Sequence, residues 1–259
     1  MSMELSAAEL ADQVHNAVAS VRVRLGRAVE CAEELDQVLW ETENALRDLP
    51  VRPQGELTEG ERSSALSTGA YQAREINTLV RRAQNELDGV REQLDAAGSA
   101  LTQAKGYLDE FDQFPGTTNP ERQVTSADLR KQLTGLETAI ATADAGAGRT
   151  ADRLGAARTN IGKIVPVHGE ERNRNVALVY EAGEAVTKDL SGLQAGLGAA
   201  SSAHTRAVQS AATADDLANA VRAAANPTPA SARQTPASSS AQDHRDRTAK
   251  APRDQQLKR

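Results

Sequence analysis

The residues of this chain that are best suited to metal or acid–base chemistry are four histidines and one cysteine. They are His15, His168, His204, His244 and Cys31, and they lie far apart in the sequence. A zinc site needs three or four such ligands at short, fixed spacings, as in HExxH or paired Cys-x-x-Cys motifs. No such spacing occurs here, and one cysteine alone makes neither an intramolecular disulfide nor a metal site. We therefore predict no metal and no cofactor.

Adjacent carboxylates are the next candidates, because two carboxyl groups that converge on one substrate atom can transfer protons. The pairs are Glu33-Glu34, Asp109-Glu110 and Asp215-Asp216. On a helix, neighbouring side chains point about 100° apart, so they do not converge. We interpret them as solvated helix faces. No GxSxG, P-loop or GxGxxG motif occurs in a strand–turn–helix context, so we predict no catalytic residues and no enzyme activity.

Two residues are candidates for interactions. His204 occupies an apolar position of a predicted helix, so it is either a pH-sensitive core residue or a histidine tolerated at a loosely packed turn. We favour the second interpretation. Trp40 lies just off the apolar positions of its helix. We interpret it as a packing anchor for neighbouring helices, with an exposed docking residue as the alternative.

The elements that carry these residues are long helices, because apolar residues recur at alternating spacings of three and four. The first helix is predicted from Ser6 to Leu49 and the second from Thr58 to Phe114. The third runs from Asn119-Pro120, or from Thr125, to Pro166, and the fourth from Val176 to Val221. Ser6-Ala-Ala-Glu9 and Thr58-Glu-Gly-Glu61 are capping boxes, which satisfy free amides at the helix start.

The two halves of the chain resemble each other. Residues 85–101 align without a gap with residues 188–204, and the helix-connecting segments share Pro50-Val51 and Pro166-Val167. We therefore predict a duplicated hairpin, at residues 1–115 and 116–226. The predicted fold is all-α: two long antiparallel helical hairpins that form an elongated, coiled-coil-like four-helix bundle. The alternatives are two tandem hairpins, or hairpins completed by a second chain.

The last segment, residues 227–259, differs in composition from the rest. It is rich in Pro, Ala and Ser, lacks apolar periodicity and is predicted to be disordered. Its net charge is +4, so residues 1–226 carry −10 of the total of −6. The tail contains no aromatic residue for stacking, so any binding to nucleic acid or to an acidic surface should be weak. The candidate contact residues are Arg245, Arg247, Lys250, Arg253, Lys258 and Arg259.

Composition narrows the class of protein further. Aromatic residues make up 2% of the chain, which is low for an enzyme that must line a pocket. The N-terminal residues are acidic and no apolar run is long enough for a signal sequence or a membrane span. The expected compartment is the cytoplasm, and the Ala, Gly, Arg and Asp bias is typical of a high-GC bacterial genome.

Tyr71-Gln-Ala-Arg-Glu75 and Tyr180-Glu-Ala-Gly-Glu184 resemble the Tyr-x-x-x-Asp/Glu signal of the small helical hairpins secreted by type VII systems. Those hairpins also carry Trp-x-Gly in a turn, whereas Trp40-Glu-Thr42 lacks the glycine. The resemblance implies an exported helical protein as one alternative. The function that the residues favour is a non-catalytic scaffold or adaptor, which binds its own copy or a helical protein partner.

Overall fold

The computed structural model describes residues 5–53, 55–114, 120–164, 176–191 and 193–226, without the side chains of residues 120–124 and 194–201. It contains α1 (Ala7–Arg47), α2 (Glu59–Gln113), α3 (Pro120–Gly162), α4 (Val176–Ser191) and α5 (Leu193–Ala225). The described residues include no strand. The all-α prediction is therefore confirmed for this part of the chain.

Both predicted capping boxes are present and explain where α1 and α2 begin. The amide of Glu9 donates to Ser6 Oγ at 3.3 Å, and the amide of Ser6 donates to Glu9 Oε2 at 2.8 Å. Thr58 and Glu61 make the same two bonds at the same distances. Donation to the carboxylates lowers the pKa of both Glu9 and Glu61, because hydrogen bonds stabilise the charged form.

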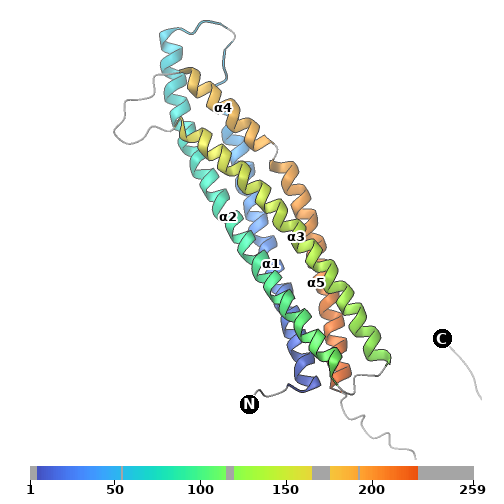
Figure 1. Ribbon diagram of the computed structural model, residues 1–259. Coiled ribbons are helices and arrows are strands. Elements are labelled where there is room, and N and C mark those ends of the chain that lie inside the picture. Colours follow the sequence, from blue (N-terminus) through green and yellow to red (C-terminus); the bar gives the residue numbers. More distant parts are fainter. Residues whose placement is uncertain (1–4, 54, 115–119, 165–175, 192, 227–259) are drawn as a thin grey trace, which may run out of the picture. The chain divides into compact units, whose positions relative to one another are not determined.

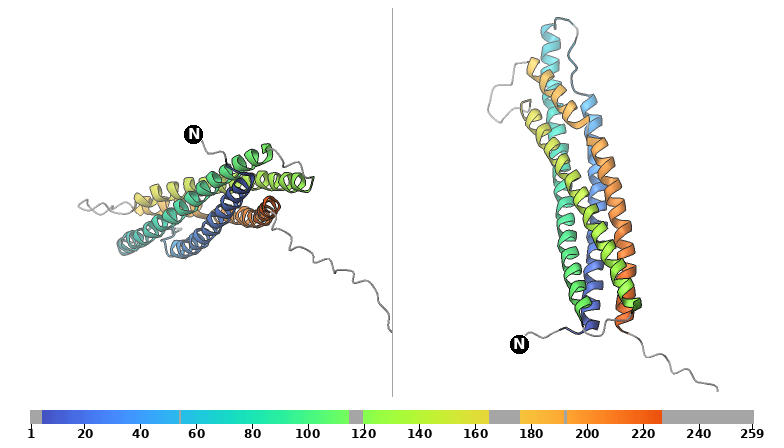
Figure 2. Two further views of the ribbon diagram at one scale, coloured as in Figure 1. Left: turned by 90° about the horizontal axis from the view of Figure 1, so that it is seen from below. Right: turned by 45° about the vertical axis from the view of Figure 1, so that its right-hand side comes forward.

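The helices pack side by side in one bundle (Figures 1 and 2). α1 contacts α2 and α5, α2 contacts α3, and α3 contacts α4 and α5, so α4 and α5 together take the fourth place. Among the described residues, α1 and α3 make no contact, and neither do α2 and α5, which makes them diagonal pairs. Figure 1 shows that successive long helices run in opposite directions. Tandem hairpins would lack the contact between α1 and α5, so the structure favours the single bundle.

One predicted boundary is wrong. The helix expected to run without interruption from Val176 to Val221 is two helices, of which α4 ends at Ser191 and α5 begins at Leu193. The sequence carries three glycines over residues 192–198. Each glycine costs roughly 1 kcal/mol relative to alanine inside a helix, so this segment has low helix propensity. In the alignment of the two halves of the sequence, Gly192 corresponds to Gly89. Gly89 lies inside the continuous helix α2.

The core consists of two apolar clusters, one at each end of the bundle. The first joins the N-terminal half of α1 to the C-terminal half of α2, the start of α3 and the end of α5, with Leu25, Leu101, Phe111, Leu129 and Leu136 fully buried. The second joins the opposite ends of these helices with α4, around Leu35, Ile76, Leu154 and Ile161. The predicted apolar positions named here therefore face the interior.

Small residues allow the helices to approach closely. A Cβ atom on Gly69 of α2 would lie 2.6 Å from Val179 Cγ1 of α4, which is shorter than any normal contact. A Cβ atom on Gly89 would lie 3.3 Å from Cys31 Sγ of α1. Gly69 is thus required at the contact between α2 and α4, which belong to different halves of the chain.

Candidate functional site

His204 lies in the core at the place where the two apolar clusters meet. Its neighbour Ala203 belongs to the first cluster, and Leu193, earlier in α5, belongs to the second. His204 is only 4% exposed, and neither ring nitrogen has a hydrogen-bond partner within the described part of the chain. Burial lowers the pKa of His204, because the charged imidazolium would lose its hydration. The predicted buried position of His204 is confirmed.

The register of α1 and α5 shows what lies beside His204. Arg22 Nη1 donates to Asp215 Oδ2 at 2.9 Å across these two antiparallel helices. Counting equal numbers of residues from this pair, and from the pairs of Asp215 with His15 and of Arg222 with Asp12, places His204 level with residues 26–33 of α1. Cys31 is partly buried there, and burial, followed by the charges of Glu86, Glu34 and Glu30, raises the pKa of its thiol. The thiol therefore stays protonated at neutral pH and is a poor nucleophile.

His15 and Asp215 form a pair that the sequence analysis missed, since they are 200 residues apart. His15 Nδ1 lies 3.6 Å from Asp215 Oδ1, and the side chains are 19% and 13% exposed. A histidine beside a carboxylate can act as a general base when a nucleophile donates a hydrogen bond to it. Among the described residues, the Nδ1 atom of His15 has no hydrogen-bond partner, so no hydroxyl or thiol donates to it there. With Arg22, the pair instead links the first helix to the last.

A second ion pair supports the same link, since Arg222 Nε lies 2.7 Å from Asp12 Oδ1. The interpretation of the adjacent carboxylates as solvated faces is therefore incomplete. Asp215 pairs with Arg22 of α1, and Asp109 of α2 pairs with Arg130 of α3. Each joins two helices and none converges with its sequence neighbour on a common point.

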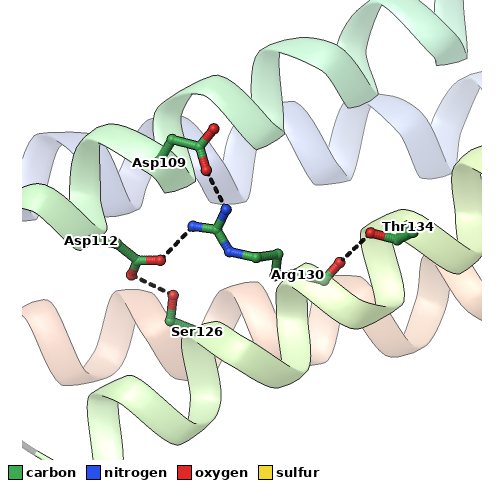
Figure 3. Close-up of polar contacts among 5 residues, drawn as sticks. All are labelled: Asp109, Asp112, Ser126, Arg130 and Thr134. Carbon is green, nitrogen blue, oxygen red and sulfur yellow. Dashed lines mark hydrogen bonds and ion pairs between the residues drawn. The ribbon is translucent and has the colours of Figure 1, made fainter.

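Arg130 forms the most connected polar cluster, between the end of α2 and the start of α3 (Figure 3). Its guanidinium contacts Asp109 and, at 2.6 Å, Asp112 Oδ2. Asp112 also accepts a hydrogen bond from the buried hydroxyl of Ser126. Hydrogen bonds to Asp112 and Asp109 raise the pKa of Arg130. These contacts join the end of α2 to the start of α3, so we interpret the cluster as a clamp between the two helices.

Replacing Arg130 by glutamine should lower the free energy of unfolding by about 1 kcal/mol, because exposed ion pairs contribute little individually and somewhat more in a network. The loss should shrink in 1 M NaCl, where screening is strong. Urea unfolding at low and high salt measures both effects. The control is Arg130→Lys, which keeps the charge but cannot bridge two carboxylates in the same way. Equal stability of all three proteins at low salt would contradict the clamp.

Trp40 is 60% exposed, so its interpretation as a packing anchor is wrong. The helical spacing explains this, because the buried residues Leu35, Val38, Leu39 and Thr42 occupy one face of α1 and Trp40 projects on the opposite face. The segment around it, residues 28–46, contains six Asp or Glu and no Lys or Arg. An aromatic ring is thus exposed on an acidic part of α1.

The two tyrosines of the type VII-like pattern have different environments. Tyr71 of α2 is 67% exposed, whereas Tyr180 of α4 is 6% exposed. Both lie within helices rather than after a helical hairpin. Only the first pattern could be read by another protein while the bundle is folded.

A hollow of about 530 Å³ lies on the surface at α2 and α3. We call it the arginine groove, and its lining residues are Thr78, Arg81, Arg82, Gln84, Asn85 and Arg158. Arg158 Nη1 of α3 donates to Gln84 Oε1 of α2 at 3.2 Å, which joins the two helices at the groove. Arg82 Nη1 lies 3.5 Å from Glu41 Oε2 of α1. The lining contains three guanidinium groups and no carboxylate.

The arginine groove was not predicted, although the sequence carries one signal for it. Residues three and four positions away on a helix are surface neighbours. For Arg81 these are Asn77, Thr78, Gln84 and Asn85, none of which is acidic. An arginine without acidic neighbours on an acidic protein could have been singled out. The contribution of Arg158 from another helix could not.

The remaining predicted site residues cannot be placed. His168, His244 and the basic residues Arg245, Arg247, Lys250, Arg253, Lys258 and Arg259 lie outside the described residues. Within the described ranges, no three His, Cys, Asp or Glu side chains are grouped so that they could hold a metal ion. No helix in that part of the chain is both long and apolar enough to cross a membrane.

Comparison with known protein families, with curated proteins and with solved structures finds no match.

Proposed function

We propose that this protein is a non-catalytic helical scaffold or adaptor that binds another helical surface through the outer face of α1. The observation that carries the proposal is the exposure of Trp40, the only tryptophan of the chain, on the side of α1 opposite the core. Tryptophan is the residue most often found at the energetic centre of protein interfaces, because it buries a large rigid surface.

The surroundings of Trp40 suggest the chemistry of the partner. Asp36 and Glu33 lie four and seven positions before Trp40, so both share its face of the helix, and both are exposed. A partner that offers an apolar pocket flanked by Lys or Arg would match the ring and the carboxylates together. Such a surface is readily supplied by an amphipathic helix, which is one of the recurrent modes of recognition.

The finer architectural predictions belong to the same proposal. A coiled-coil-like seam, a duplicated hairpin and a cytoplasmic location are what a scaffold of this composition would be expected to have. The tail, residues 227–259, would add a basic extension that makes weak, salt-dependent contacts with acidic surfaces. Export through a type VII-like system is the less favoured alternative, since Tyr180 of the second pattern is buried.

Position 40 can be tested directly with a photo-crosslinking amino acid. We expect Trp40→p-benzoylphenylalanine, activated in the producing cells, to give one discrete adduct whose mass identifies a second copy or a partner. The matched control is the same replacement of Tyr71, which is equally exposed on α2. Absence of a discrete adduct at position 40, or the same adducts at both positions, would contradict the proposal.

The stability of Trp40→Ala provides an independent check. Because the ring is exposed, we expect the free energy of unfolding to change by less than about 0.5 kcal/mol, as for other surface substitutions. Thermal and urea unfolding measure this. A loss of several kcal/mol would mean that Trp40 packs in the core, and the proposed docking role would then have no basis.

A further inference from the structure

The geometry points to the arginine groove as a binding site for a multiply charged, phosphate-type oxyanion. The lining of the groove carries arginines and amide N–H donors and lacks large apolar side chains. This assignment is independent of the proposed scaffold role, because Trp40 does not line the groove.

The positive charge of the groove is only partly compensated by nearby carboxylates. Arg81 makes no ion pair or hydrogen bond within the described part of the chain, and its helical neighbours at three and four positions are all uncharged. Arg158 hydrogen-bonds a neutral amide, and only Arg82 has a carboxylate, Glu41, at 3.5 Å. Residues 1–226 carry a net charge of −10. The groove, with three arginines and no carboxylate in its lining, is therefore a positively charged site on an acidic part of the chain. An anion bound there would relieve the repulsion between guanidinium groups.

The donors of the groove come from two helices. The bond from Arg158 uses the oxygen of Gln84 as acceptor, which leaves the Gln84 NH₂ group as a donor. Arg81 and Asn85 belong to the same stretch of α2 and add further N–H groups. Thr78 does not donate to the groove, because its hydroxyl already donates to the carbonyl of Arg74 at 3.0 Å.

The lining also selects the class of ligand. It contains no aromatic ring and no large aliphatic side chain, so an apolar ligand would gain little by entering. Guanidinium groups match pairs of oxygens on one phosphorus atom through two parallel N–H bonds. Its arginines come from two helices, so several linked phosphate groups can each meet a guanidinium group. A linear polyphosphate therefore fits better than chloride or a single phosphate.

Isothermal titration calorimetry of the full chain with tripolyphosphate, at constant ionic strength, tests the assignment. We expect one site per chain and weaker binding of inorganic phosphate. The variant Arg81→Gln/Arg158→Gln should raise the dissociation constant at least about ten-fold, because it removes two charge-assisted contacts. Trp40→Ala should bind as tightly as the unmodified protein, which separates this site from the proposed interface.

The control is Arg91→Gln/Arg149→Gln, which removes one exposed arginine from each of the same two helices outside the groove. It has the same change in net charge, so it corrects for general electrostatic attraction. We expect its dissociation constant to stay within about two-fold of the unmodified protein. No saturable binding of tripolyphosphate, equal loss in both double variants, or equal affinity for inorganic phosphate would each overturn the assignment.

Discussion

Replacing Gly69 by valine is expected to lower the free energy of unfolding by about 2 to 3 kcal/mol, because added methyl groups in a packed core force strain on their neighbours. The first added atom, Cβ, would already lie 2.6 Å from Val179 Cγ1. Val179 is 3% exposed, and its β-branched side chain has few alternative rotamers, so it cannot move aside cheaply. Urea unfolding followed by circular dichroism measures the loss.

The matched control is Gly98→Val in the same helix. A Cβ atom at Gly98 meets nothing within 4 Å, so only the helix propensity changes there. Valine has a better propensity than glycine, and we expect Gly98→Val to be neutral or slightly stabilising. Comparing Gly69→Val with Gly98→Val separates the loss of stability caused by the contact with α4 from the effect of replacing glycine by valine in a helix.

A double-mutant cycle makes the result specific to the bundle. In Gly69→Val/Val179→Ala the shortened side chain frees space for the new valine, so the two losses should not add. We expect the double variant to be more stable than the sum of the single losses predicts, by about 1 kcal/mol or more. Strict additivity would mean that α2 and α4 do not touch at these residues, as in two tandem hairpins.

The second large effect is a gain in stability from His204→Leu. A buried polar group without a hydrogen-bond partner costs about 1 to 3 kcal/mol, and both ring nitrogens of His204 lack one among the described residues. Leucine has a similar size and removes this cost. The aligned residue in the first half is Leu101, which is 2% exposed in the first apolar cluster. We expect His204→Leu to unfold at a higher temperature and urea concentration at pH 7.

The same variant should be less sensitive to acid. Burial lowers the pKa of His204 below its ordinary value of 6.5 in the folded state. As the pH falls below about 6.5, the unfolded chain binds a proton that the folded chain does not, so the unmodified protein loses stability. The loss continues until the pH reaches the lower pKa of the folded state. Without His204, this part of the pH dependence disappears.

Stability measured between pH 8 and pH 5 tests both statements. His15→Gln is the control, because His15 is partly exposed beside Asp215 and its removal leaves the buried imidazole in place. We expect the gain of His204→Leu over the unmodified protein to be larger at pH 5 than at pH 8. A variant that is destabilised at every pH would show that His204 contributes needed packing and would refute the prediction.

Local signals in the sequence predicted the helices well. The starts of α1 and α2 follow from the capping boxes at Ser6 and Thr58, because a hydroxyl and a carboxylate three residues apart satisfy free amides on their own. The buried faces follow from apolar spacing. The break between α4 and α5 was missed, since regular apolar spacing was weighted above the low helix propensity of several glycines in one short segment.

The candidate sites were predicted less well, and the reasons differ. Trp40 was assigned to packing because it adjoins the apolar positions of its helix, although one residue changes the direction of a side chain by about 100°. The pairing of His15 with Asp215 depends on the register of the first and last helices. The arginine groove needs Arg158 of α3 beside Gln84 of α2. Contacts of this kind join distant parts of the chain and leave no local pattern.

The sequence by itself determined the helical class, the helix starts and the residues that face the core, because these follow from capping and from the 3.6-residue period of one helix. Only the tertiary structure decided which helices are neighbours. That choice brings Gly69 against Val179, leaves His204 without a hydrogen-bond partner in the described part of the chain and gathers three arginines at one groove. The physical reason is that the apolar positions of a helix determine which of its faces is buried but not which other helix covers that face. The partner depends on the combined packing and ion pairing of all the helices.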